Sequence, residues 1–318
     1  MSRLPVLLNV ARRRGEVDAL AVARDAQAAG LSGVGFADSP RLFPDPLVET
    51  TRVLTSLPDV MAGPCILSLP LQHPARAASA LSTLARHFPG RLVAVVGRGE
   101  SSTANEGLPS PSLKEYAAMQ ASLKSLLDDM GAPSLHLMGA ASGPRTITAT
   151  AQALGGVMVD VGVDAKAVAA AVAHARADRR DVSVWAFLRV TIATDPSVAA
   201  DASASLLGSC ASRMVAAPQW YGLTEELASA VADLAAAHDY RRHGHAGALR
   251  LPDSDLDARL GPAAALVRQR FIVADRTELV TERLRGLAST GIDGVILAGG
   301  LPGVLDHLTE LARVARAL

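Results

Sequence analysis

The sequence lacks several features that would assign it to common classes of protein. Its 318 residues include only two cysteines, Cys65 and Cys210, which excludes a disulfide framework and a cysteine-rich metal motif. Aromatic residues make up 3%, so the core must consist mainly of alanine, valine and leucine. Lysine plus arginine total 31, as do aspartate plus glutamate, and the net charge of zero gives no electrostatic reason to expect a nucleic-acid partner.

Long hydrophobic runs are also absent, although hydrophobic residues make up 49% of the chain. No apolar run reaches the roughly 18 residues that would span a bilayer. The apolar N-terminal stretch ends at three consecutive arginines, residues 12–14, before a signal-peptide core develops. We therefore expect a soluble, cytoplasmic protein with no membrane partner and no structural metal.

Short aliphatic runs alternate with longer alanine-rich stretches, which is typical of parallel strands joined by helices. The runs lack the polar alternation of half-exposed strands, as expected where both faces are buried. Eight such units predict an α/β fold, a (β/α)8 TIM barrel with its chemistry at the C-terminal strand ends. A doubly wound open sheet would usually show a G-x-G-x-x-G turn after its first strand, and none is present there. The eight predicted strands are Leu4–Asn9, Gly33–Ala37, Val60–Leu69, Leu92–Gly97, Ser134–Met138, Gly156–Val161, Val182–Thr191 and Gly291–Ala298.

One region interrupts this rhythm. Between about residues 192 and 270 the pattern predicts helices over 196–214 and 224–238, followed by a polar stretch, and no strand. We interpret it as a helical insertion between strands seven and eight of a single domain spanning residues 1–318. His238, His243 and His245 lie in this insertion, but their spacing does not suit a metal site, so a polar lid segment is the better interpretation.

Polar residues follow the second and third predicted strands. Asp38 and Ser39 come directly after the second strand, where barrel enzymes keep catalytic groups, although a turn cap before Pro40 would explain Asp38 equally well. Cys65 lies inside the apolar third strand, which favours a small core residue over a nucleophile.

Two glycine-containing loops follow the fourth and fifth strands. In the first, Gly97 and Gly99 flank Arg98, and Glu100, Ser101 and Ser102 follow at once. The second runs through Ala141, Ser142, Gly143 and Pro144 into a predicted helix N-terminus. Each loop alone also fits an ordinary turn. Backbone N–H groups and an arginine fork on two neighbouring strands together predict the binding of a phosphate-bearing cofactor.

These motifs carry a resemblance to a known family. Ala-Asp-Ser at 37–39, Leu-Pro-Leu-Gln-His-Pro at 69–74, Gly-Arg-Gly-Glu-Ser-Ser at 97–102 and Ser-Gly-Pro-Arg at 142–145 resemble the luciferase-like flavin- and deazaflavin-dependent oxidoreductase superfamily. The likeness covers nearly the whole chain. Within this superfamily, the sequence is most similar to the methylene-tetrahydromethanopterin reductase branch, which uses the deazaflavin coenzyme F420.

The resemblance implies an oxidoreductase that transfers a hydride between coenzyme F420 and a small organic substrate at the C-terminal mouth of the barrel. The name of the branch does not identify that substrate. It also implies a homodimer. Asp38 and Glu100 match the acidic positions that face the reacting ring, and the bond between Cys65 and Ile66 matches a non-prolyl cis peptide beside it. The other matching cofactor-binding positions are Ser39, Arg98, Gly99, Ser101, Ser102, Ala141, Ser142, Gly143 and Pro144.

The sequence departs from the family pattern at one position, and alternative functions stay open. Many relatives have histidine after the acidic residue of strand two, where this chain has Ser39. This departure makes a barrel that binds a flavin or deazaflavin without catalysis one alternative. An FMN-dependent luciferase-like monooxygenase, served by a partner flavin reductase, is another, because Arg98 would suit the phosphate of either cofactor. An unrelated barrel lyase or aldolase would need a strand-end lysine or a metal-ligand cluster, which the sequence does not offer.

Overall fold

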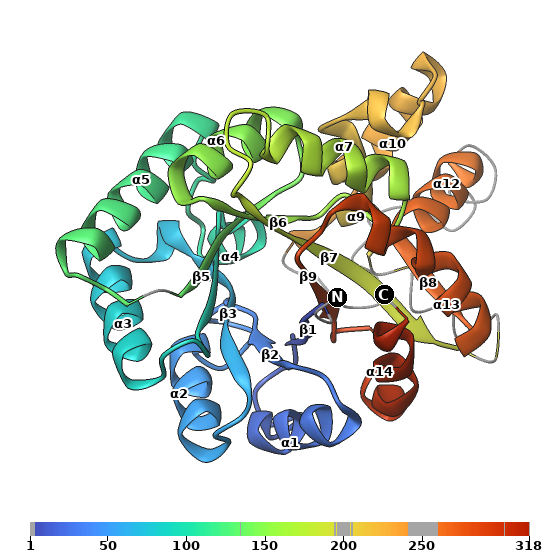
Figure 1. Ribbon diagram of the computed structural model, residues 1–318. Helices are drawn as coiled ribbons and strands as arrows, with labels where there is room; N and C mark the ends of the chain where they lie inside the picture. The colour runs from blue at the N-terminus through green and yellow to red at the C-terminus, as the bar shows by residue number, and fades with distance from the viewer. Residues whose placement is uncertain are drawn as a thin grey trace.

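Eight parallel strands close into a barrel in the computed structural model (Figure 1), which describes residues 4–133, 135–193, 195, 204, 206–240, 260–301 and 303–317. The strands run in the order β6-β5-β4-β3-β2-β1-β9-β7, and pairing between β6 and β7 closes the ring. All eight predicted strands and the predicted barrel are confirmed. The barrel strands are β1 (Val6–Val10), β2 (Gly33–Phe36), β3 (Met61–Ser68), β4 (Val93–Gly97), β5 (His136–Ala141), β6 (Gly156–Val159), β7 (Ser183–Ile192) and β9 (Gly294–Ala298).

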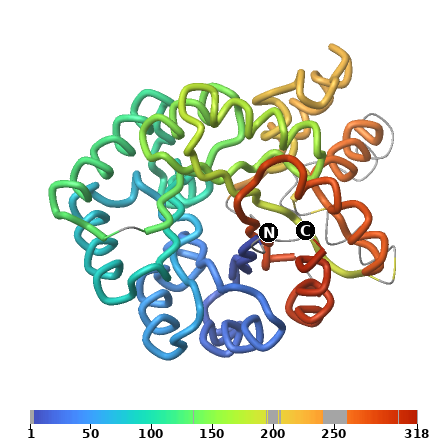
Figure 2. The backbone as a smooth tube through the Cα atoms, in the orientation of Figure 1, coloured from blue at the N-terminus to red at the C-terminus, as the bar shows by residue number. Residues whose placement is uncertain are grey.

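Helices surround the barrel, and the first and last strands meet at its closure, since β1 pairs with β9 (Figure 2). The helices outside the insertion are α1 (Ala19–Ala29), α2 (Pro46–Ser56), α3 (Pro74–His87), α4 (Glu100–Asn105), α5 (Leu113–Asp129), α6 (Pro144–Leu154), α7 (Ala165–Ala175), α13 (Thr277–Leu284) and α14 (Leu308–Arg316). Short 3-10 turns cover Leu69–Leu71, Pro218–Tyr221, Arg285–Thr290 and Leu305–His307.

Local sequence explains where several helices begin and end. The Asp45 side chain accepts the N–H groups of Leu47 and Val48, and Pro46 stands at the first helical position of α2, as its fixed φ favours. Gly30 ends α1 in the left-handed region, with φ of 94°, which residues with a Cβ rarely adopt.

A ninth strand, β8 (Ile272–Asp275), was not predicted. It pairs in parallel with the second half of β7, from Arg189 to Ile192, while the first half of β7 pairs with β9. The ten-residue β7 is thus long enough to serve two neighbours. The run Ile-Val-Ala-Asp escapes prediction because it follows helix α12 (Gly261–Phe271) directly, with no turn residue to mark a boundary.

The insertion forms a second core beside α7. It contains α9 (Leu207–Val215), α10 (Glu225–Ala236) and α12, and in Figure 1 these helices gather at the α7 side of the barrel. The Tyr221 hydroxyl donates to the Val161 carbonyl at 3.0 Å, and the Tyr221 and Phe271 rings lie 5.6 Å apart. The predicted helices are thus confirmed over 207–214 and 225–236, whereas His243 and His245 lie outside the described residues.

A small apolar cluster of strand residues includes Trp185 of β7, which is 1% exposed. The ring fits because the facing residue of β9 is Gly294, where an added Cβ would lie 2.5 Å from the ring atom Cδ2. The close approach of β7 and β9 at this level therefore requires glycine.

We expect Gly294→Ala to lower the free energy of unfolding by about 1–3 kcal/mol, because the Trp185 ring must shift to admit the methyl group. Urea denaturation measures the change. The matched control is Gly286→Ala, where the nearest atom to an added Cβ is 3.7 Å away. Equal stability of the two variants would show that the ring has room to move.

Candidate functional site

Asp38 lies at the mouth of the barrel, where the strands end. One carboxylate oxygen, Oδ2, accepts the backbone N–H of Ser68 at 2.8 Å, so the side chain reaches across to the end of β3. Its backbone carbonyl accepts the Ser102 hydroxyl at 2.5 Å. Asp38 therefore joins β2 to β3 and α4, and its carboxylate bonds to the neighbouring strand instead of capping its own turn.

The pKa of the Asp38 carboxyl is raised toward neutral pH. Burial raises the pKa of the carboxyl to about 6, and the negative charge of Asp45 acts in the same direction. The hydrogen bond from Ser68 opposes the rise without cancelling it. A carboxyl with this pKa exchanges its proton in the range where general acids and bases work.

Two serines lie next to Asp38, since Ser39 follows it in the chain and Ser102 bonds to its backbone carbonyl. Ser39 is buried, and its Oγ accepts the Nδ2 amide of Asn105 at 3.3 Å. Ser102 is buried and bonded to Asp38, whereas Ser101 is half-buried. The structure thus brings Ser39 and Ser102 together with Asp38, and Ser39 has a defined structural partner in Asn105.

The end of β3 passes close to the loop after β4. The peptide bond between Cys65 and Ile66 is cis, as the resemblance implies. An added Cβ at Gly97 would lie 2.2 Å from Ile66 Cδ1, and one at Gly99 would lie 1.9 Å from Ser68 Oγ. Glycine at both positions therefore lets the β4 loop approach the backbone and side chains of β3.

Cys65 itself is a core residue. Its side chain is buried, and burial, together with the charge of Asp160, raises the pKa of the thiol to about 12. A thiol with this pKa stays protonated and is a poor nucleophile. The interpretation of Cys65 as a small core residue agrees with this environment.

The Arg98 side chain bonds to the segment between α4 and α5. Nε and Nη2 of the guanidinium both donate to the Pro111 carbonyl, at 3.2 and 2.8 Å. Its charge nevertheless contributes to lowering the pKa of Glu100. Phosphate binding by Arg98 stays a prediction, and it would use the guanidinium donors that do not contact Pro111.

Four charged side chains form a network at the mouth, and we call them the charge network: Glu100, Asp160, Arg189 and Arg213. Arg189 of β7 binds both oxygens of Asp160, which follows β6, at 2.6 and 2.9 Å. Arg213 of α9 donates from Nε to Asp160 at 3.2 Å and from Nη1 to Glu100 at 2.9 Å. With two acids and two bases, the network is neutral when all four groups are ionised.

The network keeps its acids ionised. Burial opposes ionisation of Asp160, but Arg189 and Arg213 lower the pKa of its carboxyl to about 2. Arg213 likewise lowers the pKa of Glu100 against the opposing effect of burial. The Arg189 guanidinium lies 5.2 Å from the centre of the Phe187 ring and 6.0 Å from that of Phe271, close enough for cation–π contacts.

Sequence reasoning identified Glu100 but missed Asp160, Arg189 and Arg213. Two signals were available. Arg189 interrupts the otherwise apolar run of β7, and Asp160 is the second-last residue of the predicted sixth strand. Both are unusual for a buried parallel strand, where a charge needs a partner. No local pattern indicates Arg213, because its two carboxylate partners are 53 and 113 residues away in the sequence.

The second glycine-containing loop also reaches the insertion. Ala141 ends β5 and accepts the backbone N–H of Asp160 at 2.9 Å. Gly143 precedes α6, and an added Cβ there would lie 3.3 Å from Cβ of Ala216, just beyond α9. Ser142 and Pro144 are half-buried beside it. Cofactor binding by this loop stays a prediction.

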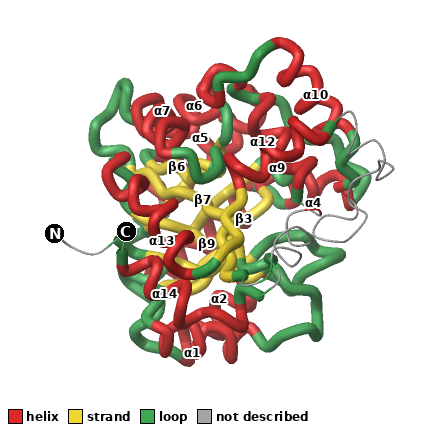
Figure 3. The backbone as a smooth tube through the Cα atoms, turned by 90° about the vertical axis from the view of Figure 1, so that its right-hand side faces the viewer, coloured by secondary structure: helices red, strands yellow, loops and turns green. Residues whose placement is uncertain are grey.

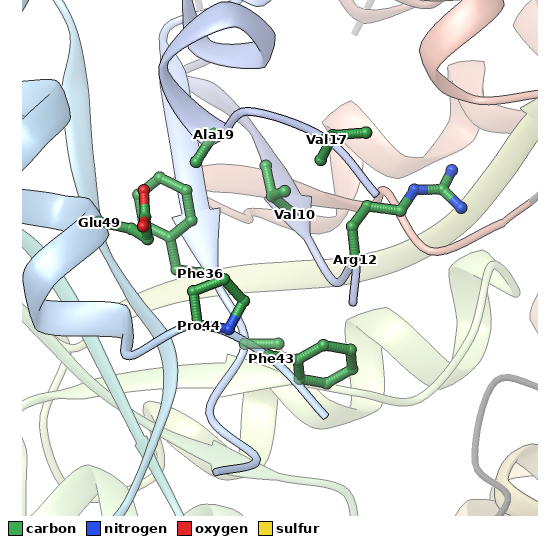
Figure 4. Close-up of a pocket in the computed structure, with 9 residues that line it drawn as sticks. Val10, Arg12, Val17, Ala19, Phe36, Phe43, Pro44 and Glu49 are labelled. Carbon is green, nitrogen blue, oxygen red and sulfur yellow. The ribbon is translucent and has the colours of Figure 1, made fainter. Parts of the chain in front are cut away.

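A pocket opens at the same end of the barrel, beside β1 and β2 (Figure 4). Its empty volume is about 290 Å³, and its lining includes Val10, Arg12, Phe36 and Glu49. Val10 and Phe36 belong to the core packed under the helices, so the pocket lies outside the barrel wall. It is separate from the charge network.

Two negative findings apply to the described residues. No helix among them is long and apolar enough to cross a membrane. No group of three or more His, Cys, Asp or Glu side chains in this part of the chain could hold a metal ion.

We expect Asp38→Asn to stabilise the protein above pH 6. The folded-state pKa of about 6 exceeds the ordinary value of 3.8, so the wild type loses stability as the pH rises from about 4 to 6. An uncharged amide avoids that loss, which amounts to about 1–3 kcal/mol. Urea denaturation at pH 4.5 and 7.5 measures it, with Asp25→Asn on the exposed face of α1 as the control that keeps the wild-type pH dependence. A constant difference between Asp38→Asn and wild type at both pH values would contradict the raised pKa.

We expect Asp160→Asn to lower the free energy of unfolding by about 3 kcal/mol or more, because Arg189 would keep its charge in a buried position without its carboxylate. The control is Asp181→Asn, which removes a bidentate partner from the exposed Arg179 and should change stability by less than about 1 kcal/mol. Equal decreases in the free energy of unfolding of the two variants would show that the buried pair stabilises the protein no more than the exposed pair.

Comparisons with known proteins agree with this architecture. An F420-dependent tetrahydromethanopterin reductase from Methanopyrus kandleri superposes with a TM-score of 0.73 at 15% identity, covering 98% of both chains. An F420-dependent secondary alcohol dehydrogenase gives 0.68 at 15% identity and covers 98% of both chains. EDTA monooxygenase from Chelativorans sp. BNC1 gives 0.64 at 13% identity, over 99% of this chain and 94% of its own.

These structural likenesses show the shared fold. No curated protein sequence matches the chain significantly. Residues 14–128, which include the Asp38 and Glu100 segments, match the family model described as luciferase-like monooxygenase. Over residues 14–128 the chain is therefore similar to the luciferase-like family, and over nearly its whole length it shares the barrel fold of the structures above.

Proposed function

We propose that the protein is an oxidoreductase that transfers a hydride between coenzyme F420 and a small organic substrate at the mouth of the barrel. The observation that carries the proposal is the contrast between two carboxyl groups there. Burial brings the pKa of Asp38 to about 6, whereas Arg213 keeps Glu100 ionised. Acids whose pKa values are pushed apart by their surroundings are typical of sites where one group moves protons and the other does not.

The residues around Asp38 fit a flavin-type ring. Ile66 is half-buried beside the cis peptide, so it offers an apolar surface to a planar ring. The Asn9 Oδ1 and Ser68 Oγ atoms are buried without a hydrogen-bond partner among the described residues. Unpaired buried polar atoms are costly, and a ring with polar edges could pair with them once bound. Gly97–Ser102 and Ala141–Pro144 are then the segments that would hold the rest of the cofactor.

The chemistry divides between cofactor and protein. When bound, the deazaflavin ring supplies the centre that accepts or gives up a hydride. Removal of a hydride from a substrate carbon leaves a proton on the adjacent heteroatom, and the ionised Asp38 would take it as general base. In the reverse direction protonated Asp38 would return it. Glu100 keeps its negative charge throughout and takes no proton in either direction.

A second candidate is an FMN-dependent monooxygenase that receives reduced flavin from a partner reductase. It is supported by the family description and by the fold shared with EDTA monooxygenase. The same strand-end loops would serve the FMN phosphate. The two candidates therefore differ first in cofactor choice.

Parallel fluorescence titrations of the purified protein with oxidised coenzyme F420 and with FMN test this choice. We expect saturable binding of F420 and no comparable response to FMN. Tight binding of FMN alone would move the assignment to the monooxygenase, and no response to either would contradict both. Asp38→Asn and Glu100→Gln serve as further variants. If both bind F420 and turn over a substrate like wild type, the catalytic assignment of these acids is wrong.

A further inference from the structure

Arg213 connects the insertion to the candidate acids of the barrel. It lies on α9, and its guanidinium contacts Glu100 at the start of α4 and Asp160 after β6. Figure 3 shows α9 and α4 close together at this side of the molecule. The Arg213 side chain is 22% exposed, so the contact lies at the edge of the mouth and is partly shielded from water.

We propose that Arg213 is a positioning residue that fixes the Glu100 carboxylate in one orientation and one charge state, leaving proton exchange at the mouth to Asp38. This inference rests on the proposed function. It gives the insertion a direct part in the chemistry, because the residue that sets the state of Glu100 comes from α9.

The geometry favours this role because Arg213 is itself held firmly. Its Nε binds Asp160, which Arg189 clamps through two further bonds. Its Nη1 also donates to Ser212 Oγ at 2.9 Å. A guanidinium anchored on one side can present its remaining donors to Glu100 in a fixed direction.

Glu100 depends on such a partner. It begins α4, a six-residue helix whose N-cap, Gly99, offers no side-chain hydrogen bond. Its side chain is 36% exposed, so the carboxylate has space to adopt other rotamers. The charged groups that act on it are Arg213 and Arg98, which favour ionisation, and Asp160, which opposes it. Arg213 is the largest of these influences and makes a direct contact.

The test is the titration of the Glu100 carboxyl in the cofactor-free protein. Carbon-13 NMR of protein labelled at the glutamate carboxyl follows each group, and Glu100→Gln assigns the signal. In wild type we expect Glu100 to titrate below its ordinary pKa of 4.5. In Arg213→Gln we expect the pKa to rise by at least about one unit, a tenfold change in proton affinity, because burial then acts with less opposition.

Two further variants distinguish a specific effect of Arg213 on Glu100 from a general disturbance of the structure. Arg213→Lys keeps the charge without the fork, so Glu100 should titrate between wild type and Arg213→Gln. Arg52→Gln is the matched control, because Arg52 also bridges two carboxylates, Asp18 and Glu49, but on the outer helix α2. It should leave Glu100 unchanged. An unaltered Glu100 titration in Arg213→Gln overturns the proposal, and should that variant not fold, an unaltered titration in Arg213→Lys overturns it.

A second readout joins the inference to the cofactor. The affinity of Arg213→Gln for coenzyme F420 should gain a pH-dependent step that wild type lacks and that the double variant Arg213→Gln with Glu100→Gln loses again. A step that survives in the double variant contradicts the assignment to Glu100. Failure of wild type to bind F420 overturns the proposed function, whereas the NMR result on Arg213 and Glu100 stands by itself.

Discussion

The buried ion pair between Asp160 and Arg189 is the interaction on which the mouth of this barrel depends. Two charges removed from water are costly unless each meets an opposite charge in good geometry, and here both oxygens of the carboxylate bind the guanidinium. The pair fixes the position of Asp160, and Asp160 then offers an anchor to Arg213 of the insertion. Arg213 in turn lowers the pKa of Glu100, so the ion pair supports the charge of Glu100 through Arg213.

The consequence for function is a division between two acids. The Asp38 carboxylate accepts a backbone N–H and has no cation bound to it among the described contacts, so burial dominates and its pKa rises. Glu100 begins α4, two residues before Ser102, which contacts Asp38, and at Glu100 an arginine dominates. The barrel thus places one acid that exchanges protons near neutrality and one that stays ionised. This contrast fits a hydride-transfer reaction, where the cofactor moves the electron pair and the protein needs a single proton carrier.

Much of the fold could be predicted from the sequence because short hydrophobic runs and helix-capping residues indicate the strands and helices locally. Mainly aliphatic runs mark all eight barrel strands, since most of their residues are buried, and Asp45 with Pro46 marks the start of α2. Strand β8 could not be predicted, because its four residues follow a helix without a break. Asp38 and Glu100 were predictable from their places after strands, whereas Arg213 was not, because its partners come from distant segments. The cis bond at Cys65 was expected through family resemblance alone, because no composition or spacing indicates it.

A crystal structure of the protein grown with oxidised coenzyme F420 would show directly where the ring binds and which acid faces it. We expect the ring at the mouth, beside the bond between Cys65 and Ile66, with the Asp38 carboxyl facing it and with Arg213 still bound to Glu100. A ring bound elsewhere, for example in the pocket beside β1 and β2, or a Glu100 carboxylate released from Arg213 while the ring is bound, would contradict this expectation.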